Sequence, residues 1–389
     1  MNHTAVVSGG ERSLLSLLVA LPAAVQARLA APRGELTAAA ERLGVPVSAI
    51  TGTAGSLRPH LIHTPRALAE MSFAALQVRR AARRSDAEVV HANSIRAGVV
   101  IGLAQAPSAA RVVHVRDCLP PGPLTTATMR LIAATATTIV ANSQYTARFV
   151  RAAAPDAPVE VVYNSVDLQR FDPARIDRAE ARARLGAVGE RRVLMAVVAQ
   201  LSPWKGQDTA IEALKLLREQ GVDAHLLLIG SARFVARATR FDNEAYLARL
   251  RELVASSGLR DHVSWLGERD DVPELMRALD VLLLPSWEEP FGRAIIEAMA
   301  LGVPVVATSV GGPAEIIEDG RQGYLVAPRE PIAWAEAIRR LAENPERARE
   351  MGSAGRRRVE QAFTVADHVA ATLAVYERVT RRPLGLRTT

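Results

Sequence analysis

The sequence is poor in the residues that mark several common classes of protein. Cys118 is its single cysteine, so an intrachain disulfide is impossible and nothing indicates an oxidising compartment. Aromatic residues make up only 4% of the chain, which leaves no readable platform for stacking nucleic-acid bases. No apolar run reaches the roughly 18 residues that span a bilayer, and residues 1–10 lack the order of a signal peptide. These absences predict a cytoplasmic protein, with at most peripheral contact at the inner face of a membrane.

The composition that remains is typical of a globular α/β protein. Hydrophobic residues make up 49% and charged residues 23% of 389 positions, a length that predicts about two domains. The formal net charge of +7 includes a local group of arginines at positions 79, 80, 83 and 84. Such spacing indicates either a solvated helix face or a surface that attracts anionic substrates or acidic lipids. From the sequence alone both interpretations stay open.

Short β-rich runs alternate with longer helical patterns along nearly the whole chain, as in parallel sheets wound with crossover helices. In the first half, long helices are predicted over 11–21 and 65–84. The strands predicted for this half are 25–31, 45–50, 88–91, 111–115, 137–141 and 159–162. Only residues 2–7 precede the first glycines, so the opening strand of a doubly wound domain is either shortened here or begins upstream.

The strand-helix rhythm breaks in the polar stretch 163–192 and restarts with the apolar strand 193–199. The second half then predicts strands at 224–229, 262–266, 281–284 and 303–307, and helices at 206–220, 243–257, 293–300 and 331–343. A last helix is predicted over 366–379. The expected organisation is an α/β fold with domains at 1–172 and 173–365, followed by a C-terminal helix and tail at 366–389.

The segment richest in chemistry runs from Ser286 to Glu297 and directly follows the predicted strand 281–284. In open α/β sheets, ligands bind beyond the carboxyl ends of the strands, where a helix N-terminus favours an anion such as a diphosphate. Gly292 allows the backbone to approach a ligand closely. Glu289 falls in the loop and Glu297 on the following helix, so the two carboxylates are placed to contact different parts of one bound molecule.

This segment, with its continuation through 298–307 and 311–315, resembles the family-4 retaining glycosyltransferases. The resemblance extends to the stretches 162–171, 201–206 and 375–378, and it covers the second half of the chain more closely than the first. It implies the GT-B fold, in which two Rossmann-like doubly wound domains face a cleft. It also implies that the C-terminal helix crosses back and packs on the N-terminal domain, which binds the acceptor.

The resemblance assigns roles to residues of the second half. Glu289 corresponds to the glutamate that contacts the donor sugar, and Glu297 to the one that binds the nucleotide ribose. Lys205 corresponds to the lysine that neutralises the donor diphosphate, whose charge grows as it leaves. The full set expected to bind the donor in this half is Gln200, Lys205, Leu266, Glu289, Pro290, Phe291, Gly292, Arg293 and Glu297.

Three positions depart from the family pattern. Gln200 stands where relatives carry an arginine, so one diphosphate-binding cation is missing, and Arg293 is the candidate replacement. Gly230-Ser231-Ala232 replaces a commoner Gly-x-Gly, and Asn164-Ser165 replaces Asn-Gly. These departures bear on the details of donor binding more than on the class of reaction.

The first half supplies a second group of candidates. Gly9 and Gly10 precede a predicted helix and are expected to bring backbone N–H groups to a phosphate. His114 lies at the end of the predicted strand 111–115 and resembles the family histidine that contacts the donor sugar, with His91 as the competing candidate. The residues expected on the acceptor side are Glu11, Arg12, Arg116 and Asp117, and the loops expected to select the acceptor are 52–64 and 116–126.

The sequence contains no Asp-x-Asp and no cluster with metal-ligand spacing, so neither a metal nor another cofactor is expected. The predicted catalytic residues are His114, Lys205 and Glu289. Lys205, backbone N–H groups and helix dipoles are expected to supply the positive field that a divalent ion supplies elsewhere. The resemblance implies transfer with retention by same-face attack, in which the donor phosphate helps to take the acceptor proton.

The predicted function is transfer of a sugar from a nucleoside diphosphate, UDP before GDP, to a hydroxyl of a small-molecule, oligosaccharide or lipid-linked acceptor. Assembly of a bacterial surface glycan is the first expected context, and biosynthesis of an antibiotic-type natural product is the second.

A non-hydrolysing sugar-nucleotide 2-epimerase shares the architecture, but the segment 289–293 argues against it. The lack of Gly-x-Gly-x-x-Gly disfavours a nicotinamide oxidoreductase. The joint presence of Glu289, Glu297 and Lys205 disfavours a non-catalytic carbohydrate-binding protein.

Overall fold

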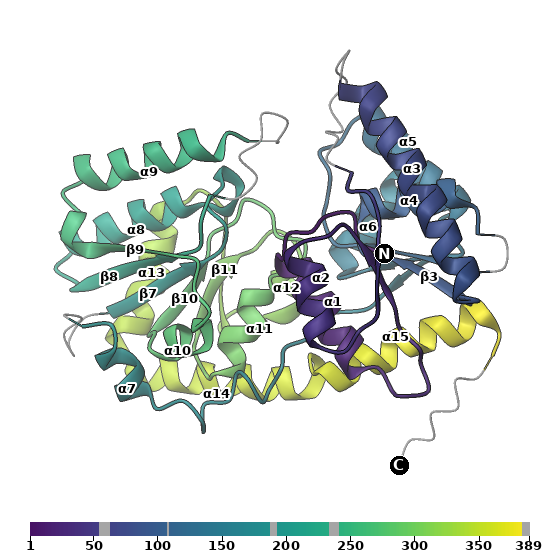
Figure 1. Ribbon diagram of the computed structural model, residues 1–389. Coiled ribbons are helices and arrows are strands. Elements are labelled where there is room, and N and C mark those ends of the chain that lie inside the picture. The colour runs from purple at the N-terminus through teal and green to yellow at the C-terminus, as the bar shows by residue number, and fades with distance from the viewer. Residues whose placement is uncertain (54–62, 107–108, 187–192, 233–240, 383–389) are drawn as a thin grey trace. The chain divides into compact units, whose positions relative to one another are not determined.

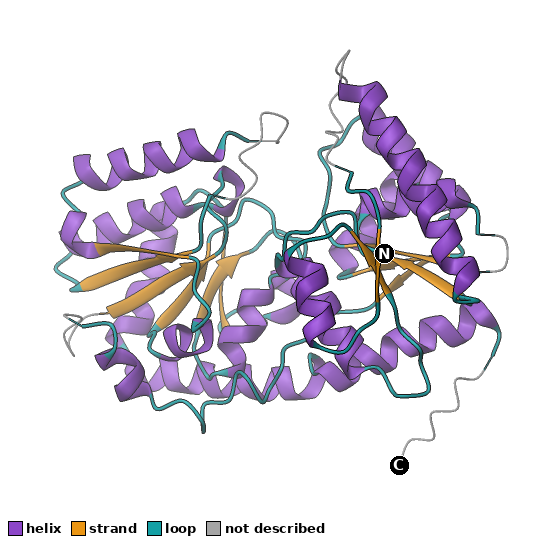
Figure 2. Ribbon diagram, viewed as in Figure 1, coloured by secondary structure: helices purple, strands orange, loops and turns teal. Residues whose placement is uncertain are grey.

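The computed structural model describes residues 1–53, 63–106, 109–186, 193–232 and 241–382. Contacts divide the chain into two compact units: unit 1 comprises Met1–Ser165 and Val365–Thr389, and unit 2 comprises Val166–Thr364. Each unit has parallel β-strands with helices on either side of them (Figures 1 and 2). Most of the loop 52–64, expected to select the acceptor, lies outside the described residues.

Unit 1 alternates strands and helices as the sequence predicts, with element ends shifted by a few residues. Its elements are α1 (Gly9–Ala20), β1 (Leu29–Ala31), α2 (Glu35–Arg42), β2 (Val47–Ala49), α3 (His63–Arg84), β3 (Val89–Ala92), α4 (Ile95–Ala104), β4 (Ala110–Val115), α5 (Pro123–Thr135), β5 (Thr138–Ala141), α6 (Gln144–Ala153), β6 (Val159–Val161) and α15 (Val365–Thr380). Serine side chains cap two of the helices: Ser94 Oγ accepts the Ala97 N–H at 3.1 Å, and Ser143 Oγ accepts the Thr146 N–H at 3.0 Å.

The first seven residues lie between two parallel sheets of unit 1 without forming a regular strand. On one side is the pair β1-β2, and on the other is the four-stranded sheet β3-β4-β5-β6. The Asn2 N–H donates to Ala30 O at 2.9 Å, and the Asn93 N–H donates to Met1 O at 3.0 Å. Residues 1–7 thus fill the place of a central strand with irregular backbone, and they lead directly into Gly9.

Helix α15 belongs to unit 1, as predicted for the C-terminal helix. Val375 on this helix is buried against Val112 of β4 and Val140 of β5, so α15 covers the sheet face that these two strands share. Val369 and Leu373 pack against Leu17 of α1. The helix therefore completes the apolar core of unit 1 on that face, although the whole of unit 2 separates it from the rest of unit 1 in the sequence.

The chain passes from unit 1 to unit 2 and back at positions that differ slightly from the predicted domain limits. The Val166 N–H donates to Phe363 O at 3.0 Å, and Val166 forms an isolated parallel bridge with Thr364. Both ends of unit 2 are held together by this contact. Residues 166–172, which the sequence places in the first domain, therefore group with unit 2.

Unit 2 repeats the alternation with a larger sheet. Its elements are α7 (Arg178–Ala183), β7 (Val193–Val198), η1 (Pro203–Lys205), α8 (Gln207–Glu219), β8 (Ala224–Ile229), α9 (Asn243–Ser256), η2 (Arg260–His262), β9 (Val263–Gly267), α10 (Val272–Arg277), β10 (Val281–Leu284), α11 (Arg293–Ala300), β11 (Val305–Thr308), α12 (Pro313–Ile316), β12 (Gly323–Val326), α13 (Pro331–Glu343) and α14 (Pro345–Ala362). Strand β12, the short helices α7, α10 and α12, and the long helix α14 were not predicted from the sequence. Helix α14 is mostly polar and buries only Met351, Gly352, Gly355 and Val359, so its hydrophobic signal is weak.

The six parallel strands of unit 2 follow the order β12-β11-β10-β7-β8-β9. Strand order reverses between β7 and β10, because the chain builds outward to β9 on one side of β7 before it returns to β10 on the other. Helices α8 and α13 pack together over one face of this sheet, whereas α11 and α14 pack together on the other. In doubly wound sheets, the point of reversal is where ligands bind, beyond the carboxyl ends of the strands.

Trp334 of α13 belongs to the apolar core of unit 2. Trp334 is fully buried, and its indole N–H donates to Ala327 O at 2.9 Å. Replacing Trp334→Ala removes this packing and is expected to lower the free energy of unfolding of unit 2 by about 3–5 kcal/mol in denaturant titrations. Ile332 on the same helix is 66% exposed, so Ile332→Ala is the matched control and is expected to change that free energy by less than about 0.5 kcal/mol. Equal losses for the two variants would contradict this packing.

Candidate functional site

The loops that follow β7 and β10 meet at the point where the strand order of unit 2 reverses. Strand β10 pairs with β7 in parallel, with Leu283 beside Val197. Beyond the strands, the Trp287 N–H donates to Trp204 O at 2.9 Å, which joins the two loops through their backbones. The residues that follow these strands are therefore neighbours, although some 80 positions separate them in the sequence.

Lys205 and Glu289 form an ion pair across these loops. Lys205 Nζ donates to Glu289 Oε2 at 2.6 Å, and the two side chains are only 13% and 10% exposed. Ser286 Oγ donates to the same carboxylate oxygen at 3.0 Å. Lys205 Nζ also lies 3.8 Å from the centre of the Trp204 ring, a cation–π contact. The structure thus brings together two of the three predicted catalytic residues, and it adds Ser286 and Trp204, which the sequence analysis assigned no role.

Glycines allow the backbones of these loops to touch. Gly206 has a φ of +68°, and a Cβ there would lie 2.0 Å from Pro285 O. Gly311 has a φ of +110°, and its Cβ would lie 2.0 Å from Glu289 O. Glu289 is fixed by two backbone bonds: its N–H donates to Val310 O at 3.2 Å, and its carbonyl accepts the Gly312 N–H at 2.8 Å. No other residue fits at Gly206 or Gly311 without moving the loop that holds Glu289.

The N-terminus of α11 follows Glu289 directly. Pro290, Phe291 and Gly292 are buried, and Gly292 precedes the first turn with a φ of +100°. The Phe291 ring packs edge-on against Phe363 with ring centres 5.9 Å apart. A helix start at the carboxyl edge of a sheet presents backbone N–H groups and the positive end of the helix dipole, which favour an anion.

The remaining donor candidates of unit 2 lie around this edge. Arg293 Nη2 donates to Glu297 Oε1 at 2.8 Å within α11, so the residue suggested to replace an arginine at position 200 pairs with the predicted ribose ligand. Gln200 follows β7, and its carbonyl accepts a bond from Gln207 Nε2 at 2.9 Å. Leu266 is half-buried in β9. The donor contacts of these four residues stay predictions.

In unit 1, the Gly9-Gly10 turn begins α1, and Glu11 belongs to its cap. Glu11 is 5% exposed, and its carboxylate accepts bonds from the Ser8 N–H at 3.1 Å and from Asn2 Nδ2 at 3.2 Å. A glutamate at the third helical position that bonds back to the capping serine forms a capping box. Glu11 therefore stabilises the glycine turn, and this role is distinct from its predicted place beside an acceptor.

Arg116 lies just beyond β4 in a buried polar network. Its Nε donates to Asn93 Oδ1 at 3.0 Å, and its Nη1 donates to Asn164 Oδ1 at 2.6 Å and to Ser13 Oγ at 3.3 Å. Arg116 is 8% exposed, whereas the other two acceptor-side candidates, Arg12 and Asp117, are exposed. Asn93 and Ser13 were assigned no role from the sequence, because single polar residues carry little signal, and Asn164 was named only as a departure from the family pattern.

His114 and His91 lie side by side in the interior of unit 1, with ring centres 5.6 Å apart. His91 Nδ1 is 2.7 Å from the Tyr376 hydroxyl of α15. His114 is 1% exposed, and neither of its ring nitrogens has a hydrogen-bond partner among the described residues. Burial, reinforced by the Arg116 charge and, for His91, by the Met1 ammonium group, holds the pKa of both rings well below the ordinary 6.5. Contact of His114 with a donor sugar stays a prediction, and it requires the ring to become accessible.

Within the described ranges, no three histidine, cysteine, aspartate or glutamate side chains gather in a way that suits a metal ion. None of the helices in those ranges combines the length and the apolar character that crossing a membrane demands.

The histidine pair generates a prediction about pH. Below about pH 6.5 both rings bind protons in the unfolded chain but stay neutral in the folded unit, so unfolding takes up protons. The free energy of unfolding of unit 1 is therefore expected to fall as pH decreases from ~7.5 to ~5.5, as measured by denaturant titration. Replacing His114→Leu breaks no hydrogen bond to the described residues and removes one of the two groups, so the slope should become shallower. An unchanged slope in that variant would contradict this account.

Comparison with known families gives matches over most of the chain. Residues 7–170 match the family described as Glycosyltransferase Family 4, and residues 177–358 match the family described as Glycosyl transferases group 1. Spore coat protein SA of Bacillus subtilis (strain 168) is 33% identical over 253 residues, which are 62% of this chain and 64% of that protein. A D-inositol 3-phosphate glycosyltransferase of Salinispora tropica is 37% identical over 230 residues, which are 56% of this chain and 45% of that protein. The chain thus spans about half to two thirds of the length of these relatives.

Comparison with solved structures extends the likeness to the whole chain. Anabaena Alr3699/HepE in complex with UDP has a TM-score of 0.81 at 26% identity, with 97% of this chain and 98% of that one covered. Its complex with UDP-glucose gives the same TM-score at 27% identity, with coverage of 96% and 98%. A sucrose-phosphate synthase from Thermosynechococcus elongatus shares the fold with a TM-score of 0.72 at 23% identity, with 86% of this chain and 83% of that one covered. The GT-B fold implied by the sequence resemblance is confirmed.

Proposed function

Because the chain belongs to the family-4, group 1 glycosyltransferases, we propose that it transfers a sugar from a nucleoside diphosphate, UDP by preference, to a hydroxyl acceptor. The observation that carries this proposal is the buried Lys205–Glu289 pair beside the N-terminus of α11, at the switch point of the unit 2 sheet. HepE, which is 26% identical over nearly its full length, has been crystallised with UDP and with UDP-glucose. UDP-sugars are cytoplasmic metabolites, so we place the reaction in the cytoplasm.

Lys205 is proposed to bind the donor diphosphate. Its ammonium group has three N–H donors, and Glu289 occupies one of them at 2.6 Å. The Trp204 ring and the Glu289 carboxylate hold the ammonium in place before the donor arrives, so little reorganisation is needed. Positive charge fixed where the leaving diphosphate gains negative charge lowers the barrier to transfer. The N-terminus of α11 adds backbone N–H groups on the same side of the sheet.

Glu289 is proposed to orient the donor sugar. Oε2 accepts bonds from Lys205 and Ser286, and Oε1 has no hydrogen-bond partner among the described residues. A carboxylate oxygen accepts bonds from sugar hydroxyls, and the backbone contacts with Val310 and Gly312 keep it in a fixed position. Glu297 is proposed to bind the ribose from the next turns of α11. We further propose that transfer retains configuration and needs no metal, with a phosphate oxygen of the donor taking the acceptor proton.

The acceptor is proposed to bind unit 1. Arg12 and Asp117 are exposed beside the glycine turn and the end of β4, and the buried Arg116 network supports both segments. A polyhydroxylated precursor of a bacterial surface glycan is the acceptor class that we favour. This choice is supported by the relatives named as a lipopolysaccharide core biosynthesis mannosyltransferase and as D-inositol 3-phosphate glycosyltransferases.

The first prediction from this proposal concerns binding of UDP. Replacing Lys205→Ala is expected to weaken UDP at least about tenfold, because it removes a charge-assisted contact to the diphosphate. The other lysine of the chain, Lys215, is half-exposed on α8 and faces Glu219, so Lys215→Ala is the matched control and should bind UDP like the wild type. The measurement is isothermal calorimetry with EDTA present. Binding that needs a divalent ion, or that is the same in both variants, would count against the proposed site.

The second prediction separates binding from catalysis. Replacing Glu289→Gln keeps the shape and one acceptor oxygen but removes the charge opposite Lys205. UDP affinity is expected to stay within a few-fold of wild type, whereas release of UDP from a UDP-sugar donor should fall about 100-fold or more. Comparison of the calorimetric Kd with the steady-state rate checks this split. A variant with normal turnover would show that Glu289 has no part in the reaction.

A further inference from the structure

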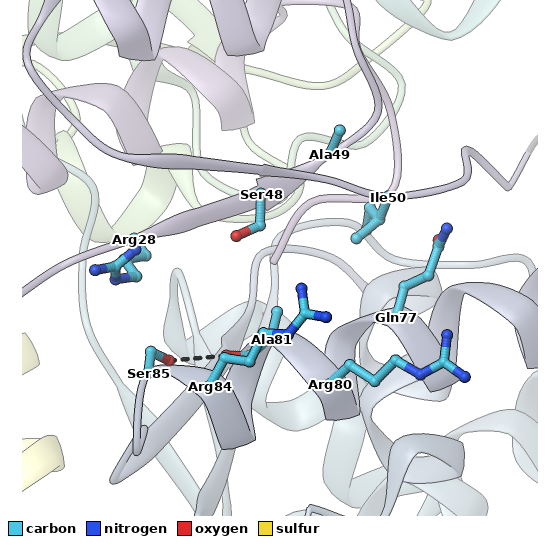
Figure 3. A pocket seen from close by; sticks show the side chains of 9 residues that line it. All are labelled: Arg28, Ser48, Ala49, Ile50, Gln77, Arg80, Ala81, Arg84 and Ser85. Carbon is cyan, nitrogen blue, oxygen red and sulfur yellow. Dashed lines mark hydrogen bonds between the residues drawn. The ribbon is translucent and has the colours of Figure 1, made fainter.

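A basic hollow of about 310 Å³ lies between α3 and the β1-β2 pair of unit 1. One side carries Arg28, which directly precedes β1, together with Ser48 and Ala49 of β2. The other side is the C-terminal part of α3 with Arg80 and Arg84 (Figure 3). Three arginines from two parts of the chain thus line one concave surface, which the spacing of arginines along α3 alone did not reveal.

The polar side chains around this hollow offer donors, and no carboxylate lines it. Its lining residues are Arg28, Ser48, Ala49, Ile50, Gln77, Arg80, Ala81, Arg84 and Ser85. The Thr51 N–H donates to Gln77 Oε1 at 2.7 Å, so the acceptor of this amide is used and its NH2 group is left as the donor. Ser48 adds a hydroxyl. Guanidinium, amide and hydroxyl donors around one space match the oxygens of a phosphate.

The three guanidinium groups are not neutralised within the part of the chain that the structure describes. No ion pair or hydrogen bond of Arg28, Arg80 or Arg84 is found there, whereas the nearby Arg382 pairs with Glu88. Like charges around one hollow repel each other, and an anion bound among them relieves that repulsion. The absence of an internal carboxylate therefore favours an external anion.

The hollow is distinct from the regions that the proposed reaction uses. Arg28 precedes β1, and Arg84 and Ser85 precede β3, so these residues lie at the amino ends of their strands, whereas Ala49 and Ile50 line the hollow from the carboxyl end of β2. The glycine turn, Asn93 and Arg116 lie beyond the carboxyl ends of the strands of unit 1. None of the residues that line the hollow belongs to the glycine turn, to the Arg116 network or to the donor candidates, so a ligand in the hollow is separate from the ligands of the proposed reaction.

We propose that Arg28, Arg80 and Arg84 form a second anion site, which binds a phosphate group carried by a ligand other than the sugar donor. The phosphate belongs either to a soluble phosphate ester or diphosphate, or to the headgroup of an anionic lipid. Phe73 and Leu76, which precede Arg80 on α3 at helical spacing, are 52% and 50% exposed. These apolar side chains suit contact with a lipid, and the three arginines suit both sources.

The test uses the whole chain and two probes, inorganic pyrophosphate in calorimetry and vesicles of phosphatidylglycerol in co-sedimentation. The site variant is Arg80→Gln with Arg84→Gln. The control variant is Arg42→Gln with Arg83→Gln, which removes the same charge from exposed positions of unit 1 outside the hollow. For pyrophosphate, the reference chain and both variants carry Lys205→Ala, because pyrophosphate also suits the proposed donor site of unit 2. The result for the hollow then does not depend on whether that donor site exists.

Binding of at least one probe is expected, with a loss of about tenfold or more in the site variant and less than about twofold in the control variant. Binding of pyrophosphate alone assigns the site to a soluble phosphate, and binding of vesicles with the same mutational pattern assigns it to a lipid headgroup. The proposal is overturned if neither probe binds. It is also overturned if the site and control variants lose affinity equally, because net charge alone then explains the binding.

Discussion

Parallel pairing of β10 with β7 is the constraint on which the arrangement of unit 2 depends. It places the ends of two strands side by side, and it makes the loops that carry Lys205 and Glu289 neighbours. The chain visits β8 and β9 between these strands, so the pairing also produces the reversal of strand order. An opening for a ligand arises at such a reversal because the crossover helices leave toward opposite faces of the sheet. The pairing of β10 with β7 therefore determines where the Lys205–Glu289 ion pair of the proposed site forms.

The two units hold their buried charges in different ways. In unit 2, Lys205 and Glu289 compensate each other, so removal of either leaves an unpaired charge in a site with little water. In unit 1, the Arg116 guanidinium is surrounded by neutral acceptors from Asn93, Ser13 and Asn164. These neutral partners fix the orientation of the guanidinium group beyond the end of β4.

The sequence predicted the two-part α/β architecture and the glycine-containing loop around Glu289, because buried parallel strands are continuous apolar runs with glycines after them. It missed β12, an edge strand in which only Gly323 and Val326 are buried, and α14, whose apolar stripe is interrupted by arginines and glycines. Lys205 and Glu289 were predicted as site residues from the family resemblance. Their ion pair could not be predicted, because it depends on the pairing of β10 with β7. The burial of His114 and Glu11 could not be predicted, because histidine and glutamate near a strand end or a helix start are usually exposed. The contact of the neighbouring His91 with Tyr376 joins residues that are distant in the chain, so it could not be predicted either.

The central claim is that the loops after β7 and β10 and the N-terminus of α11 form the binding site for the donor diphosphate. A crystal structure of the chain with UDP tests this claim most directly. The account predicts that the diphosphate lies within hydrogen-bond distance of Lys205 Nζ and of backbone N–H groups at the start of α11, with the ribose near Glu297. UDP bound elsewhere, or bound in unit 2 with Lys205 still engaged only by Glu289, would contradict it.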